Sequence, residues 1–247
     1  MASGLRKIGL REKPDEIPKR QAVSAVGQAG LIMEYEKAFE RYDKKVAQIL
    51  LTSEDLSNRK RYLNARNTIY TLLSWKIVPI INENDTVAVE DIKFGDNDNL
   101  AAMIANVIEA DLFINLTATD GLYDCNPSQF KKAKLIPLVC EITDEIEAAA
   151  TTETSSVGTG GMKSKIIAAK KVTSIGIPCI IAPGKRKNIL SDIMLGKEVG
   201  TLFLPQTSRL ASRKYWIAFT LRPRGRLIVD DGAKKALLEK GKSLLPS

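Results

Sequence analysis

The alternation of apolar and polar segments along the chain predicts an α/β fold. Short, continuous apolar runs occupy residues 44–52, 77–82, 110–117, 177–183 and 199–205, and polar or glycine-containing segments separate them. Runs of this length are typical of strands that are buried on both faces. We therefore expect them to form the strands of a covered sheet.

Segments with helical periodicity separate these apolar runs. Apolar residues recur at helical spacing over four segments: 19–42, a segment from Thr52 or Ser53 to about Ser74, 99–109 and 162–174. The first 18 residues are polar, contain two prolines and predict a loop. Strands that alternate with helices predict a mostly parallel sheet sandwiched by helices, with ligands in the loops at the carboxyl ends of the strands.

The pattern changes after about Gln206. WIAF, RLIV and a short AKKALLEK helix are typical of a small β-rich module, so we expect two domains, 1–206 and 207–247. Ten basic and only three acidic residues follow residue 207, in a chain whose net charge is +8. Such a basic tail fits either an anionic partner such as nucleic acid or an ordinary solvated surface.

The composition excludes several kinds of chemistry. The chain has no histidine, which excludes imidazole bases and histidine metal ligands. Its three cysteines are isolated, so they predict neither a disulfide framework nor a metal site and favour a reducing cytoplasm. No apolar run is long enough to span a membrane, and the N-terminus is not a signal peptide. Catalysis must then use carboxylates, lysines, hydroxyls, backbone amides or an oxygen-bound metal.

Two segments rich in carboxylates and amides lie close together in the sequence. Residues 82–85 (NEND) follow an expected strand, and residues 95–99 (GDNDN) precede an expected helix. These side chains supply acceptors for an ammonium group, donors for a carboxylate and oxygen ligands for Mg²⁺. The alternative is a turn-rich loop in which Asp98 or Asn99 caps the next helix.

A glycine-rich segment opens the helix expected at 162–174. Residues 157–165 (VGTGGMKSK) allow backbone amides to surround phosphate oxygens, and the helix N-terminus favours negative charge. Lys165, one turn into the helix, is placed to reach a phosphoryl group. The segment is not a Walker A loop, and a flexible surface loop is the alternative.

Residues 116–123 (LTATDGLY) follow the expected strand at 110–117. They either line a nucleotide pocket or form only the turn that ends the strand. The spacing of the residues alone favours the turn.

Several segments together resemble the glutamate 5-kinase family of amino-acid kinases: INENDTVAVEDIKFGDNDNLAA, DGLYDCNP, VGTGGMKSKIIAAKKVTSIGI and RKYWIAFTLRPRGRLIVDDGAKKALLEKGKSLLP. The likeness runs almost end to end, and the last segment resembles the beginning of a PUA domain. The resemblance implies ATP-dependent phosphorylation of the side-chain carboxylate of L-glutamate, which is the first step of proline biosynthesis. It also implies Mg-ATP as the phosphoryl donor and association into a homo-oligomer.

The resemblance also implies roles for single residues. Asp85 and Asn97 would bind glutamate, Asp98 would organise the catalytic lysines and the metal-nucleotide complex, and Thr117 would lie at the nucleotide. Lys165 would neutralise charge on the transferring γ-phosphoryl group. The residues expected to wrap the ATP phosphates are Thr159, Gly160, Gly161, Met162, Lys163, Ser164 and Lys165. No protein ligand for the metal is assigned.

The sequence departs from the family pattern at three places. ASGLRKIGL resembles the end of the family's Ser-Gly-Ala loop, so the preceding strand with its phosphate-binding lysine and substrate-binding serine is expected to be missing. The family's Leu-Thr-Asp ends in Ala118 here, and the tail stops about half-way through a PUA domain. Alternatives are therefore a catalytically impaired pseudokinase or regulatory paralogue, a kinase for another acidic substrate such as acetylglutamate, and RNA binding through the tail.

Overall fold

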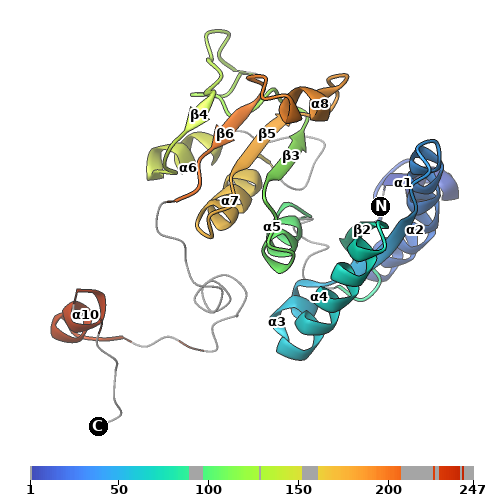
Figure 1. Cartoon of the computed structure of the whole chain (residues 1–247), viewed down its shortest axis with the longest axis horizontal. Helices are drawn as coiled ribbons and strands as arrows, with labels where there is room; N and C mark the ends of the chain where they lie inside the picture. Colours follow the sequence, from blue (N-terminus) through green and yellow to red (C-terminus); the bar gives the residue numbers. More distant parts are fainter. Residues whose placement is uncertain are drawn as a thin grey trace.

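The computed structural model describes residues 2–88, 97–127, 129–151, 161–206, 225, 228–239 and 241 (Figure 1). Its helices are α1 (Ala2–Ile8), α2 (Ile17–Glu40), α3 (Ser53–Ser57), α4 (Arg59–Ser74), α5 (Asn97–Val107), α6 (Asp144–Thr151), α7 (Met162–Thr173), α8 (Ile189–Met194) and α10 (Asp231–Leu238). Its strands are β1 (Val46–Leu51), β2 (Val78–Glu83), β3 (Phe113–Thr117), β4 (Leu138–Val139), β5 (Cys179–Pro183) and β6 (Thr201–Phe203).

The described strands form two sheets. β1 and β2 form a parallel pair, and the second sheet has the order β3-β5-β6-β4. Within it β3–β5 and β4–β6 are parallel, whereas β5–β6 is antiparallel. The prediction of a mostly parallel sheet is confirmed. The antiparallel pair was not predicted, because a continuous apolar run does not encode the direction of its strand.

Helices cover both faces of the four-stranded sheet. One apolar cluster joins the sheet to α5 and α7 and includes Ala102, Ile166, Val172, Ile181 and Phe203. A second cluster joins the opposite face of β3 and β5 to α8. β3 and β5 therefore pack side chains against helices on both faces, which agrees with their mainly apolar composition.

Helix α5 contacts both sheets. Its residues Leu100, Met103, Ile104 and Val107 form a cluster with α3 and α4, and partly buried residues of β1 and β2 pack against it. The opposite side of α5 contributes to the cluster with α7 and the four-stranded sheet. A cavity of about 390 Å³ lies between α5, β2 and β3 and is lined almost entirely by apolar side chains. Helix α5 therefore holds its N-terminal turn near the ends of both β2 and β3.

The prediction of a loop over the first 18 residues is wrong for residues 2–8, which form α1. Helix α1 crosses α2 at two glycines. A Cβ atom on Gly4 would lie 1.8 Å from the carbonyl oxygen of Val23, and one on Gly27 would lie 2.7 Å from the nitrogen of Gly4. The two backbones meet here because neither glycine has a side chain. Packing against α2 therefore stabilises α1 as a helix, although its local sequence is polar.

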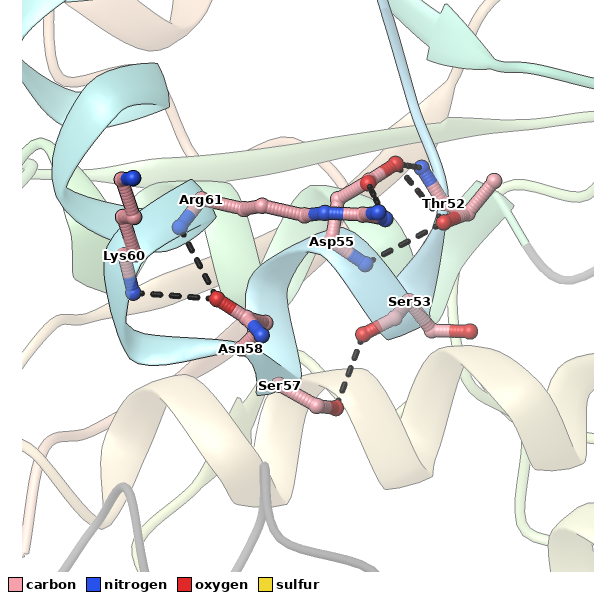
Figure 2. Close-up of polar contacts among 7 residues, drawn as sticks. All are labelled: Thr52, Ser53, Asp55, Ser57, Asn58, Lys60 and Arg61. Carbon is pink, nitrogen blue, oxygen red and sulfur yellow. Dashed lines mark hydrogen bonds and ion pairs between the residues drawn. The ribbon is translucent and has the colours of Figure 1, made fainter.

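The single helix predicted after Thr52 is two helices, α3 and α4 (Figure 2). Thr52 caps α3, since its hydroxyl accepts from the Asp55 N–H at 3.2 Å and the Asp55 carboxylate accepts from the Thr52 N–H at 2.9 Å. Asn58 ends α3 and caps α4, because its side-chain oxygen accepts from the N–H groups of Lys60 and Arg61. The chain therefore turns at Asn58 rather than continuing as one helix.

Asp55 joins the caps of the two helices. Its carboxylate accepts from the Thr52 hydroxyl at 2.7 Å and from the Arg61 guanidinium at 2.8 Å (Figure 2). Burial alone would raise the pKa of Asp55, but these hydrogen bonds and the charge of Arg61 outweigh burial, so the pKa is lowered. The charged form of Asp55 therefore stabilises this corner of the fold.

The short helix predicted in the tail is confirmed as α10, whereas α6, α8 and β4 were not predicted. The strands expected in WIAF and RLIV lie almost entirely outside the described residues, so the division at residue 206 stays a prediction. Within the part of the chain that the structure describes, no helix is both long and apolar enough to cross a membrane.

Candidate active site

Asp98, in the first turn of α5, lies at the centre of a polar cluster. Its Oδ1 accepts from the side-chain amide of Asn115 on β3 at 2.8 Å. Its Oδ2 accepts from the Ser164 hydroxyl at 2.6 Å and from the Lys165 ammonium at 2.9 Å. The first turns of α5 and α7 and the middle of β3 thus meet at one carboxylate.

Helix packing explains why Ser164 and Lys165 reach Asp98. Helices α5 and α7 lie in one apolar cluster, through Ala102 and Ala105 of α5 and several residues of α7. Lys171, six residues after Lys165 on α7, is hydrogen-bonded to Asn99 of α5. The first turns of the two helices are therefore neighbours, which supports the predicted pairing of Asp98 with Lys165.

Burial strengthens the ion pair between Asp98 and Lys165. Their side chains are 17% and 14% exposed. A pair this shielded is screened less by salt than a surface pair, and removing either partner leaves a poorly solvated charge. Burial raises the pKa of the nearby Cys179 thiol, and the negative charge of Asp98 raises it further. Cys179 is therefore a neutral, unreactive thiol of the core.

Ser164 connects Asp98 to the start of α7. The Ser164 hydroxyl lies 2.6 Å from Asp98 Oδ2 and 2.9 Å from the carbonyl oxygen of Gly161. Both partners are acceptors and a hydroxyl has one proton, so only one of them receives it at a time. The charged carboxylate is the stronger and closer acceptor. Gly161 occupies the N-cap of α7 and has no side chain to accept from the first N–H groups of that helix.

A chain of three amides lies beside this cluster. The Asn97 amide donates to Asn82 Oδ1 at 3.2 Å, and the Asn82 amide donates to Gln28 Oε1 at 3.1 Å. These bonds join the start of α5 to the end of β2 and to α2. Because the amide of Asn97 donates to Asn82, its own oxygen is oriented away from that bond, and no donor to this oxygen is found within the part of the chain that the structure describes.

The segment after β2 carries Asp85 in a turn. The N–H groups of Val87 and Ala88 both donate to the carbonyl of Asn84, and the Asp85 side chain is partly buried. The structure thus brings Asn97 to the strand end that precedes Asp85, and the predicted binding of glutamate by these two residues stays a prediction. No direct contact of Asp85 with Asn97 is found among the described residues.

Thr117 is the last residue of β3, and its carbonyl accepts from the N–H of Gly184, which follows β5, at 2.7 Å. It therefore lies where two parallel strands end, and Ala118 beside it is exposed. Lys163 is also exposed, and Met162 is buried in the core. Thr159 and Gly160, which were also predicted to bind phosphate, lie outside the described residues.

Sequence reasoning missed two residues of the cluster, Asn115 and Gln28. Asn115 is only 7% exposed and is the one amide in the otherwise apolar strand FINLT. A buried amide needs a hydrogen-bond partner, so a lone asparagine in a core strand was a usable signal. Gln28 gives no comparable signal, because glutamine is common on helix surfaces.

Among the described residues no group of three or more Asp, Glu or Cys side chains is arranged to hold a metal ion. Asp98, the carboxylate at the centre of the cluster, already accepts three hydrogen bonds from protein groups. Mg²⁺ commonly binds proteins through one or two carboxylates together with substrate phosphates and water.

Comparison with known sequences identifies relatives over the whole chain. A sequence model described as the amino acid kinase family matches residues 1–183. The chain is 62% identical over all its 247 residues to a protein named glutamate 5-kinase from Syntrophus aciditrophicus and spans 64% of that protein's length. It is 52% identical over the same span to one of that name from Geobacter sulfurreducens, of which it covers 66%. The chain is thus just under two thirds as long as these relatives.

Solved structures with the same fold are more distant in sequence. An isopentenyl phosphate kinase aligns with a TM-score of 0.52 at 14% identity, over 81% of this chain and 78% of that one. A UMP kinase from Bacillus anthracis aligns with a TM-score of 0.50 at 13% identity, over 84% of this chain and 75% of that one. Likeness at this level of identity shows the fold alone.

Proposed function

The chain belongs to the amino acid kinase family, and from this premise we propose that it phosphorylates the side-chain carboxylate of L-glutamate with ATP. The product would be glutamyl 5-phosphate, formed in the first step of proline biosynthesis. The observation that carries the proposal is the shielded pair of Asp98 and Lys165, which lies beside the amide cluster at Asn97. The names of the relatives that match the whole chain support the choice of glutamate.

The amino acid would bind at the end of β2. The side-chain oxygen of Asn97 would accept from the ammonium group of glutamate, and the Asp85 carboxylate would supply opposite charge. The orientation of Asn97 is fixed through Asn82, so this acceptor is preorganised. The side-chain carboxylate of glutamate would then point toward Lys165.

The nucleotide would bind at the first turn of α7. The N-terminal end of α7 and the charge of Lys163 favour the phosphates of ATP, together with Gly161 and Ser164. Thr117 would contact the nucleotide from the end of β3. Thr159 and Gly160 stay part of the proposed phosphate loop, and Met162 holds the helix in the core.

In the transfer, an oxygen of the glutamate carboxylate forms a bond to the γ-phosphorus while the bond to the β,γ-bridging oxygen breaks. ADP leaves with that electron pair, so the reaction needs positioning and charge stabilisation rather than a covalent intermediate on the protein. Lys165 neutralises charge that develops on the γ-phosphoryl oxygens, and Asp98 holds the ammonium of Lys165 in place. Mg²⁺, when bound with ATP, supplies further positive charge at the phosphates.

We further propose that the protein works in the cytoplasm as a homo-oligomer. The unpaired cysteines of the chain support a reducing compartment, and its resemblance to the glutamate 5-kinase family supports self-association. RNA binding through residues 207–247 is a separate prediction, tested by whether RNA affinity falls steeply with salt.

The proposal is tested by ADP release in a coupled assay with Mg-ATP. L-Glutamate should stimulate release, whereas N-acetylglutamate, L-aspartate and L-glutamine should not. Asp98→Asn should abolish the stimulation, because the neutral amide no longer holds Lys165. A chain whose ADP release is unaffected by glutamate, or is stimulated more by acetylglutamate, contradicts the proposal.

A further inference from the structure

Asn115 is an unusual residue for its position in the fold. It lies in β3 opposite Ile181 of β5, and its neighbours on the same face of β3 are Phe113 and Thr117. Phe113 and Ile181 belong to the largest apolar cluster. Asn115 itself is 7% exposed, so it places an amide in an otherwise apolar layer between the sheet and its helices.

A buried amide destabilises the fold unless it is hydrogen-bonded, whereas leucine, which has the same branched shape but is larger, has no such requirement. The side-chain bond found for Asn115 in the described structure goes to Asp98 Oδ1, at 2.8 Å. The asparagine is thus explained by the carboxylate that it contacts rather than by the packing of the sheet.

The bond divides the two oxygens of Asp98 between different tasks. Asn115 occupies Oδ1 from the sheet, while Ser164 and Lys165 donate to Oδ2 from α7. A carboxylate with only Oδ2 bound is free to rotate about its Cβ–Cγ bond, which moves Oδ2 away from Lys165. With Oδ1 anchored on a rigid strand, the plane of the carboxylate is fixed.

We propose that Asn115 is a positioning residue that acts through Asp98: it fixes the carboxylate so that Lys165 is held where the phosphoryl group transfers. The predicted effect of Asn115 on turnover rests on the proposed function. The effect on the geometry of Lys165 does not depend on that function and is measured separately.

The first test compares Asn115→Leu with wild type in the glutamate-dependent ADP assay. The kcat should fall about 10- to 100-fold, because misplacing a catalytic group has effects of this size. The KM values for glutamate and ATP should stay within about twofold, because Asn115 contacts neither substrate. The melting temperature should fall by only about 2–4 °C, because the substitution removes one donor from Asp98 Oδ1, which is a loss of about 1 kcal/mol.

Two further variants separate positioning from packing. Asn115→Asp keeps the shape of the side chain but places a second carboxylate against Asp98, so its kcat should be lower than that of Asn115→Leu. Ile114→Val, the neighbour on β3 whose side chain packs on the opposite face of the sheet, should keep kcat within about twofold of wild type. If Asn115→Leu loses its cooperative thermal transition, Asn115→Ser is measured in the same way.

The second test reads the position of Lys165 without turnover. Trace labelling with acetic anhydride, followed by mass spectrometry, gives the reactivity of Lys165 relative to Lys170 on the same helix. In Asn115→Leu this ratio should rise about threefold, because a loosened ion pair exposes the amine. Ile114→Val should leave the ratio unchanged.

The two tests together decide the inference. The inference is overturned if Asn115→Leu keeps its kcat within twofold of wild type and its labelling ratio is unchanged. It is also overturned if the loss of kcat is explained by partial unfolding of the variant at the assay temperature. If the wild-type chain shows no glutamate-dependent turnover, the proposed function fails, and the labelling ratio alone decides the role of Asn115. A raised ratio then supports positioning, and an unchanged ratio overturns it.

Discussion

Replacing Lys165 by methionine tests the ion pair at the centre of the site. The substitution keeps an unbranched side chain of similar length but removes the ammonium that lies 2.9 Å from Asp98 Oδ2. If that charge stabilises the transferring phosphoryl group, kcat should fall about 10²- to 10³-fold, which corresponds to about 3–4 kcal/mol of transition-state stabilisation. The KM for glutamate should change much less.

The same substitution should have a smaller effect on folding. Asp98 is left with two donors, Asn115 and Ser164, so its charge is not fully unpaired. We therefore expect the free energy of unfolding to fall by only about 1–2 kcal/mol, less than for a fully buried pair that loses one partner. Urea unfolding of both proteins measures this difference.

Lys170→Met is the matched control for Lys165→Met. Lys170 lies on the same helix and is also paired, with Glu147, but the pair is far more exposed and distant from Asp98. Its loss should change the free energy of unfolding by less than about 1 kcal/mol and leave kcat within about twofold. Equal losses of kcat in the two variants, or a Lys165→Met enzyme that keeps its turnover, would show that the Lys165 ammonium does not stabilise the transferring phosphoryl group.

Three further predictions concern the fold. Gly200→Ala should lower the free energy of unfolding, measured by urea titration, by about 2–4 kcal/mol more than Gly196→Ala. Both glycines have a positive φ, but only at Gly200 would a Cβ lie 2.2 Å from the Ile181 carbonyl oxygen. Equal losses of stability in the two variants would exclude this clash. Ser24→Ala should raise the melting temperature, because the buried Ser24 hydroxyl has no partner among the described residues, and a fall would reveal one. Asp55→Asn should have a lower free energy of unfolding than wild type at pH 7. The difference between the two proteins should narrow as the pH falls below 3.8, because the contacts that lower the pKa of Asp55 stabilise only its charged form. A difference in free energy that does not depend on pH would contradict this.

Much of the fold could be predicted because its local signals agree with its tertiary contacts. The predicted apolar runs form β1, β2, β3, β5 and β6; β3, β5 and β6 contain buried residues, whereas β1 and β2 are mostly only partly buried. The failures have specific causes. Helix α1 exists because glycines let two backbones touch, and the break between α3 and α4 depends on one capping asparagine. Neither a long-range crossing nor the choice between capping and continuing a helix is encoded in periodicity.

The site could be predicted only in part. The pairing of Asp98 with Lys165 came from a resemblance to the glutamate 5-kinase family, which the relatives confirm, and the structure brings these two residues together. Thr159 and Gly160 were assigned in the same way and stay predictions. Asn115 was missed because a strand residue was judged by its apolar surroundings rather than by its own unmet hydrogen bonds. Buried amides in core strands therefore merit attention when a site is sought from sequence.

Trapping with hydroxylamine distinguishes transfer of a phosphoryl group to the carboxylate of glutamate from other causes of ADP release. An acyl phosphate reacts with hydroxylamine to give a hydroxamate, which forms a coloured complex with ferric ion. With L-glutamate and Mg-ATP, the chain should produce glutamyl hydroxamate in an amount equal to the ADP released, and Asp98→Asn should produce none. ADP release without hydroxamate would exclude glutamate as the phosphoryl acceptor, and hydroxamate at an equal rate from Asp98→Asn would exclude the proposed role of Asp98.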